Sequence, residues 1–150
     1  MGQITSLFVR KVINEADDSV DKDALLHSIG IAPDSPIDPS HMVPDTEYYA
    51  LLERLSVLDG NGTTIPLRSG GSMRCDDYGA FGLAWKSATN LLGSFQRAER
   101  YARVLTSVST YEIEIADAGA FMHLHRVGER CLGQRRRPLT GTTKQAGTPA

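Results

Sequence analysis

Cysteine is scarce in this sequence, and so are long apolar runs. Only two cysteines, Cys75 and Cys131, occur in 150 residues, too few for a disulfide framework or a cysteine-rich zinc site. So few thiols are typical of a reducing compartment, and we expect a cytoplasmic protein. No apolar run approaches the roughly 18 residues that span a bilayer, and the first residues lack the basic and apolar regions of a secretory signal. We therefore expect neither a membrane protein nor a secreted one.

A strong net charge is also lacking, because 16 Lys and Arg residues nearly balance 18 Asp and Glu residues. Residues 1–125 hold 10 Lys and Arg against 17 Asp and Glu, a net charge of −7, whereas residues 126–150 hold 6 against 1, a net charge of +5. An acidic body is a poor partner for a phosphate backbone, so we expect residues 1–125 not to bind nucleic acid. The basic segment, with Arg135, Arg136 and Arg137 among Gly, Thr, Pro and Gln, predicts a disordered tail.

With 41% hydrophobic residues, the chain has the composition of one globular domain. Apolar spacing and capping residues predict helices over residues 4–16, 21–30 and 45–58. The four prolines within 31–44 predict an extended loop. The glycine pair within 69–72 is not followed by the Lys-Ser/Thr of a phosphate loop, and we interpret it as a turn. The third helix is expected to turn these side chains inward: Tyr48, Leu51, Leu52, Leu55 and Leu58.

The second half of the chain predicts two more helices and a hairpin. The first helix, capped by Asp76 or Asp77 and running to Ala88, contains Gly79 and Gly82. Glycine costs roughly 1 kcal/mol relative to alanine inside a helix, so the pair indicates close approach of another element or of a small ligand, and packing is the simpler interpretation. The longest helix, capped by Thr89 and extending to about residue 106, is expected to bury its apolar side chains: Leu91, Leu92, Phe95, Ala98, Ala102 and Leu105.

After this helix the apolar residues no longer follow helical spacing and instead alternate with polar residues. Residues 111–115 predict a half-buried strand, residues 117–119 a turn, and residues 120–125 the partner strand of a hairpin. The sequence therefore predicts an α+β fold in which four to five helices pack over a single β-hairpin, as an incomplete version of a larger domain.

Reactive side chains are present but form no local catalytic signature. Cys75 and Asp76 can be combined with any of the four histidines into a Cys-His-Asp arrangement, because a thiolate nucleophile needs an imidazole to activate it. His123 and His125 share one face of the predicted strand, but two imidazoles require a third metal ligand. We expect no enzyme, no metal site and no cofactor.

The segment Tyr78-Gly79-Ala80-Phe81-Gly82, followed by Thr89-Asn90-Leu91 and Arg100-Tyr101, resembles the N-terminal effector domain of AraC-type transcription regulators. The likeness extends from about Leu25 to His125. It implies a cytoplasmic bacterial sensor domain that binds a small-molecule effector, forms a homodimer or a heterodimer with a full-length regulator, and controls helix-turn-helix units. We find no such units in this sequence.

We accordingly expect residues 1–125 to form the effector-sensing domain of a truncated regulator and residues 126–150 to form a disordered basic tail. The change in charge at about residue 126 suggests a frameshift or premature end of a longer gene. The alternative is a small stand-alone binding protein whose three-arginine tail contacts an acidic partner.

Residue type alone points to the ligand-binding positions. Aromatic side chains with polar tips line small-molecule pockets, which favours Tyr78, Trp85 and Tyr101. Arg74 and Arg100 are the predicted charge partners for an acidic ligand.

Overall fold

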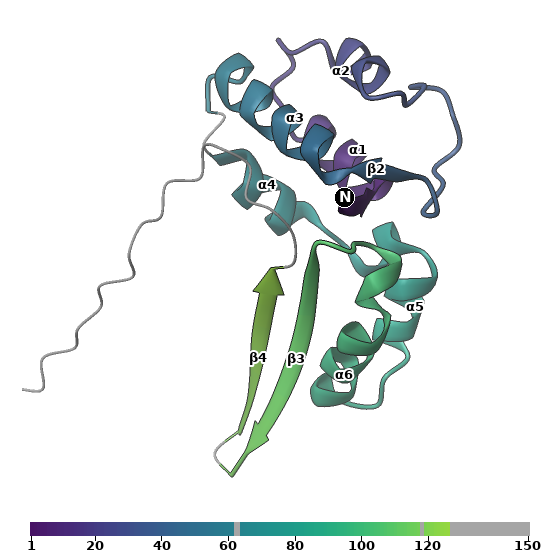
Figure 1. Ribbon diagram of the computed structural model, residues 1–150, viewed down its shortest axis with the longest axis vertical. Coiled ribbons are helices and arrows are strands. Elements are labelled where there is room, and N and C mark those ends of the chain that lie inside the picture. Colours follow the sequence, from purple (N-terminus) through teal and green to yellow (C-terminus); the bar gives the residue numbers. More distant parts are fainter. Residues whose placement is uncertain (62–63, 118, 127–150) are drawn as a thin grey trace, which may run out of the picture.

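The computed structural model describes residues 1–61, 64–117 and 119–126. Within them the chain is α+β, with six α-helices and two antiparallel sheets of two strands each (Figure 1). The predicted fold class is confirmed, but the predicted counts of four to five helices and a single hairpin are wrong. The predicted basic tail lies outside the described residues, apart from Arg126.

Three helices in the first half enclose the main core. They are α1 (Ser6–Asn14), α2 (Lys22–Ser28) and α3 (Asp45–Leu58). The Asp21 side chain accepts a hydrogen bond from the Ala24 N–H and begins α2, and Gly30 follows that helix at φ +75°. Buried side chains of these helices and of neighbouring segments form one apolar cluster: Val9, Val12, Ile13, Ala16, Val20, Leu25, Leu26, Ile31, Val43, Leu51, Leu55 and Ile65.

A small sheet joins the beginning of the chain to the end of the proline-rich loop. Strand β1 (Gln3–Thr5) pairs antiparallel with β2 (Met42–Pro44), and Ile4 lies opposite Val43. The backbone N–H of Thr5 also donates to the carbonyl of Leu105, so a segment from the second half lies along β1. The predicted helix start at residue 4 and the predicted loop to residue 44 are both wrong here, because three-residue strands are too short to show a period of two.

Helix α4 (Ile65–Ser72) replaces the turn predicted at residues 69–72. Pro66 lies in its first turn, where a missing N–H is tolerated and the fixed φ favours a helix. Ile65 is fully buried in the core. These contacts outweigh the low helix propensity of Gly70 and Gly71.

The predicted helix from residue 76 to 88 is divided in two. A 3-10 turn, Cys75–Tyr78, is followed by α5 (Ala80–Lys86), and Gly79 joins them at φ +55°. A Cβ on Gly82 would lie 1.6 Å from the Cys75 carbonyl oxygen. The close approach inferred from the glycine pair is therefore confirmed at Gly82, where another backbone segment passes.

Helix α6 (Leu91–Tyr101) and a 3-10 turn, Ala102–Val104, follow. Asn90 rather than Thr89 caps α6, since its side chain accepts a hydrogen bond from the Gly93 N–H. At 11 residues α6 is shorter than α3, with 14 residues, so the expectation that it is the longest helix is wrong. Leu58 and Leu91, both predicted to point inward, are 54% and 69% exposed because they lie at helix ends that neighbouring elements do not cover.

The predicted hairpin is confirmed. Strands β3 (Ser109–Ala116) and β4 (Gly119–Arg126) pair antiparallel, with Tyr111 opposite Leu124 and Ile113 opposite Met122. Every residue of β4 is exposed and only part of β3 is covered, so the strands are less buried than their alternation predicts. Figure 1 shows the hairpin extending beside α6 and away from the N-terminal helices.

Candidate functional site

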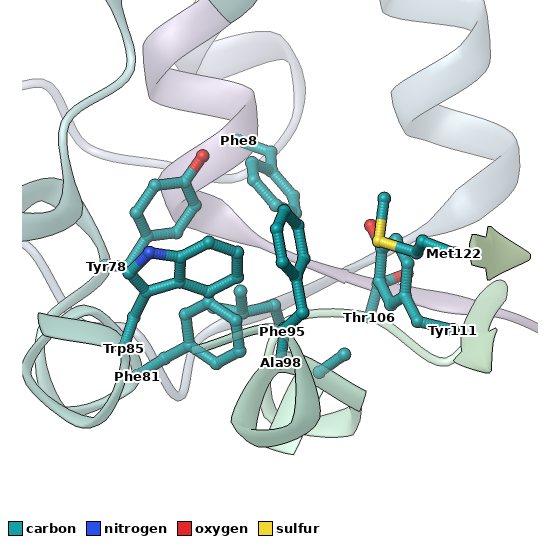
Figure 2. Close-up of a pocket in the computed structure, with 11 residues that line it drawn as sticks. Phe8, Tyr78, Phe81, Trp85, Phe95, Ala98, Thr106, Tyr111 and Met122 are labelled. Carbon is teal, nitrogen blue, oxygen red and sulfur yellow. The ribbon is translucent and has the colours of Figure 1, made fainter. Parts of the chain in front are cut away.

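An aromatic cavity of about 240 Å³ lies where α1, α5, α6 and the hairpin meet. Figure 2 shows its aromatic rings converging from these different elements. The walls are predominantly apolar and are formed by Phe8, Tyr78, Phe81, Trp85, Phe95, Ala98, Ala102, Leu105, Thr106, Tyr111 and Met122. We call this the aromatic cavity.

One wall is a continuous series of ring contacts. Phe81 and Trp85 lie four residues apart on one side of α5, and the ring of Tyr78, at the end of the 3-10 turn, packs against Phe81. Ring centroids are 5.9 Å apart between Tyr78 and Phe81 and 6.4 Å apart between Phe81 and Trp85. Phe8 of α1 meets Tyr78 at 5.8 Å, and Phe95 of α6 meets Trp85 edge-on at 5.0 Å. These geometries are favourable for aromatic pairs and hold the wall in shape.

The opposite side is formed by α6 and the hairpin. Ala98 and Ala102 are buried, and their small side chains leave the space that the rings surround. Tyr111 and Met122 cover this space from β3 and β4. The Glu99 carboxylate accepts a hydrogen bond of 3.3 Å from the Ile113 N–H, which ties β3 to α6.

Among the residues that the structure describes, no charged side chain lines the aromatic cavity. Burial raises the pKa of the Tyr78 hydroxyl, with further contributions from Asp77, Tyr111 and Cys75, so Tyr78 is neutral. The Thr106 hydroxyl is already engaged, since it donates to the Gln3 carbonyl at 3.3 Å and accepts from the Val108 N–H at 3.1 Å. Such walls favour a small, uncharged and mainly apolar guest.

The predicted ligand-binding residues occupy three places. Tyr78 and Trp85 lie together in the aromatic cavity. Arg100 and Tyr101 instead line an open groove of about 580 Å³ between α5 and α6. Arg74 precedes the 3-10 turn, and its backbone N–H donates to the Asp77 carboxylate at 2.9 Å. Ligand binding by these five residues stays a prediction.

Sequence reasoning missed several residues of the aromatic cavity, chiefly Phe8, Phe81, Phe95, Tyr111 and Met122. Phe81 lies four residues before Trp85, so helical spacing from Trp85 was sufficient to identify it. Phe8 and Met122 come from distant parts of the chain, and no spacing rule relates them to α5.

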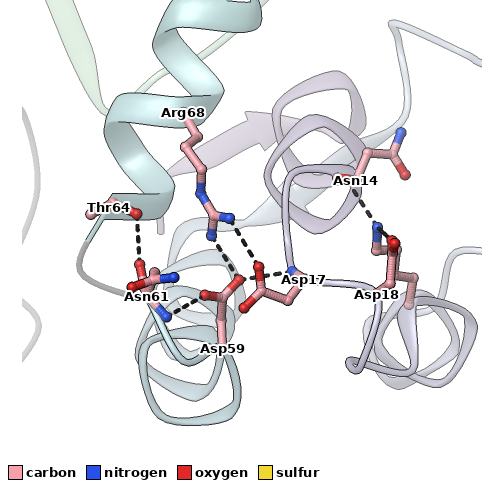
Figure 3. Close-up of polar contacts among 8 residues, drawn as sticks. Asn14, Asp17, Asp18, Asp59, Asn61, Thr64 and Arg68 are labelled. Atoms are coloured by element: carbon pink, nitrogen blue, oxygen red, sulfur yellow. Dashed lines mark hydrogen bonds and ion pairs between the residues drawn. The ribbon is translucent and has the colours of Figure 1, made fainter.

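A second cluster of polar side chains joins the end of α3 to α1 and α4, as Figure 3 shows. Arg68 contacts the Asp59 carboxylate at 2.7 Å and the Asp17 carboxylate at 3.2 Å. Burial of Asp59 acts to raise its pKa, but hydrogen bonds from Arg68 and from the backbone N–H groups of Asp17 and Asn61 lower the pKa to about 2. Asp59 is therefore ionised at neutral pH, and the cluster fastens three segments together.

The hairpin histidines are paired with carboxylates. His123 contacts Glu114 at 2.8 Å, and His125 contacts Glu112 at 3.1 Å. In the described ranges, no group of three or more His, Cys, Asp or Glu side chains is placed to hold a metal ion. Within the same residues no helix is long and apolar enough to cross a bilayer.

The aromatic cavity, formed between helices and a hairpin, has the apolar lining typical of a small-molecule site. Residues 20–144 match the family model for the arabinose-binding domain of AraC transcription regulators, which lies at their N-terminus, and the chain belongs to this family. The family is one of ligand-sensing regulatory domains and is not an enzyme class. No curated protein matches the sequence. The resemblance found from the glycine pair and the Arg-Tyr motif is thus confirmed.

Proposed function

We propose that this chain is the effector-sensing part of an AraC-type regulator and that its effector occupies the aromatic cavity. The observation that carries the proposal is the cavity itself. Aromatic side chains from α1, α5, α6 and the hairpin surround a volume of about 240 Å³. The effector is a compact, uncharged and mainly apolar molecule, because the described walls carry no charged group. Tyr78 and Trp85 contact it directly.

Sensing follows from the different origins of the cavity walls. Phe8 belongs to the N-terminal helices, Phe95 to α6, and Tyr111 and Met122 to the hairpin. A guest that contacts all of them binds best when these elements are close together, so it shifts the population toward that arrangement. The shift alters how the domain presents DNA-binding helix-turn-helix units that lie outside these 150 residues, and this coupling is reciprocal.

The proposal is tested by thermal unfolding of the purified chain with toluene, cyclohexanol or arabinose. A ligand at about 100 times its dissociation constant stabilises the folded state by roughly 2.7 kcal/mol. We expect toluene or cyclohexanol to raise the melting temperature and arabinose to leave it unchanged, because a sugar needs several polar partners that these walls lack.

Two variants show whether the ligand enters the aromatic cavity. Ala98→Leu adds three carbon atoms inside the cavity, whereas Ala50→Leu adds the same atoms at an exposed position of α3. Stabilisation by toluene should be lost in Ala98→Leu and retained in Ala50→Leu. Stabilisation by arabinose alone, or equal responses of the two variants, would contradict the proposal.

A further inference from the structure

The groove between α5 and α6 differs in chemistry from the aromatic cavity. Its volume is about 580 Å³, and it lies on another side of the same two helices. Gly93, Arg97 and Arg100 follow one another at intervals of four and three residues, so they share one face of α6. Ser87, which follows α5, and Gln96 and Tyr101 of α6 are the other lining residues with polar side chains.

Both arginines of the groove contact neutral groups of the described residues. Arg97 donates to the Ala84 carbonyl at 2.6 Å and to the Ser87 hydroxyl, and both acceptors are neutral. The guanidinium of Arg100 lies 5.7 Å from the centroid of the Tyr101 ring. Among the residues that the structure describes, neither Arg97 nor Arg100 forms an ion pair.

The groove belongs to an acidic body, since residues 1–125 carry a net charge of −7. Within the described residues, four cations pair with carboxylates, namely Lys11, Lys22, Arg68 and Lys86. Arg10, Arg54, Arg74 and Arg103 also form no ion pair there, but none of them lines the groove, where two such arginines share one face of α6. The groove thus concentrates two guanidinium charges in an otherwise acidic body. Such a groove attracts negatively charged molecules.

The hydrogen-bond donors of the groove are suited to binding the oxygen atoms of an anion. Arg97 uses only its Nη1 atom in hydrogen bonds to the described residues, so its Nε and Nη2 hydrogens are free to bind a ligand. Guanidinium groups bind carboxylate and phosphate oxygens through paired, charge-assisted hydrogen bonds. The ring of Tyr101, which is 41% exposed, adds a flat apolar surface beside them.

We propose that the α5–α6 groove is a second binding site, for a small organic anion that carries a carboxylate or phosphate group. Arg100 and Arg97 bind the anionic group, and Tyr101 contacts the remainder of the molecule. The site is separate from the aromatic cavity and does not depend on the function proposed for that cavity. It accounts for the roles of Arg100 and Tyr101, which the aromatic cavity does not use.

The test is calorimetric titration of the folded chain with sodium benzoate and with inorganic phosphate at constant ionic strength. Arg100→Gln removes a charge from the groove, whereas Arg103→Gln removes an exposed charge nearby that does not line it. We expect saturable binding of at least one anion, weakened about tenfold or more by Arg100→Gln and less than about twofold by Arg103→Gln. Binding of benzoate alone assigns a carboxylate, and binding of phosphate alone assigns a phosphate.

Two results of these titrations would overturn the proposal, and a third variant provides a further test. One is the absence of saturable binding of both anions, and the other is equal weakening by the two arginine variants, which would indicate nonspecific attraction. Benzoate also has an aromatic ring, so it is titrated into Ala98→Leu as well. Retained affinity in that variant supports the groove, whereas lost affinity would place benzoate in the aromatic cavity and contradict the assignment.

Discussion

Gly82 is the position where a single added carbon atom should disturb the fold most directly. An alanine Cβ at this position would lie 1.6 Å from the carbonyl oxygen and 2.6 Å from the carbonyl carbon of Cys75. Real Cβ atoms essentially never come within 3.0 Å of such neighbours, so α5 and the Cys75–Tyr78 turn must separate by more than an ångström. Overpacking of this kind costs typically about 1–3 kcal/mol.

The matched control is Gly70→Ala in α4. Gly70 is helical, its φ is not positive, and within the described part of the chain no neighbouring atom lies within 4 Å of the position that an alanine Cβ would take. Alanine should therefore stabilise the protein by roughly 0.5–1 kcal/mol, the usual advantage of alanine over glycine in a helix. The same substitution is thus expected to have opposite signs at the two positions.

Thermal unfolding measures the difference. For a chain of this size 1 kcal/mol changes the melting temperature by roughly 2–4 °C, so Gly82→Ala should lower it by several degrees while Gly70→Ala raises it slightly. Because the displaced turn carries Tyr78, Gly82→Ala should also weaken toluene binding. Equal melting temperatures for the two variants would refute the steric reasoning.

Two further predictions concern the N-terminal half. Asp59→Asn should destabilise the protein at pH 7. The difference in stability between this variant and wild type should shrink as the pH falls from about 4 to about 2. The reason is that the Asp59 pKa is lowered from 3.8 to about 2, so the stabilisation in wild type is lost as that carboxylate protonates. Urea unfolding at each pH measures the free energy of unfolding. Asp18→Asn removes an exposed carboxylate and is the control, for which this free energy should change little. A difference between Asp59→Asn and wild type that does not vary with pH argues against the ion cluster. Leu55→Ala, in the core, should cost about 2–5 kcal/mol in the same assay. Leu58→Ala, on the exposed end of the same helix, should cost much less, and similar losses for both leucines contradict the described packing.

Local sequence patterns were sufficient to predict an element where its own residues mark where it begins and ends. Asp21 and Gly30 mark α2 at both ends, and the alternation from Tyr111 to Ile115 marks β3. Helix α4 was not predictable in this way, because its glycine pair resembles a turn. Its stability comes from burial of Ile65 and from the contacts of Arg68 with Asp59 and with Asp17, which is distant in sequence.

The candidate site was predictable only in part, for the same physical reason. Tyr78 ends the 3-10 turn and Trp85 lies in α5, and their residue type indicated a pocket. Phe8, Tyr111 and Met122 reach the aromatic cavity through tertiary packing alone. Arg100 and Tyr101 line the groove, whereas Ala98 of the same helix lines the aromatic cavity, and the spacing of residues along α6 does not say which of them meets a ligand.

Trp85 is the one tryptophan of the sequence and lies in the wall of the aromatic cavity, so its fluorescence reports occupancy of that cavity. The most direct measurement is a titration of this fluorescence with toluene in wild type, Ala98→Leu and Ala50→Leu. The account predicts a saturable change in wild type and Ala50→Leu that is absent from Ala98→Leu. A flat wild-type titration, or a saturable change in Ala98→Leu equal to that of wild type, would contradict it.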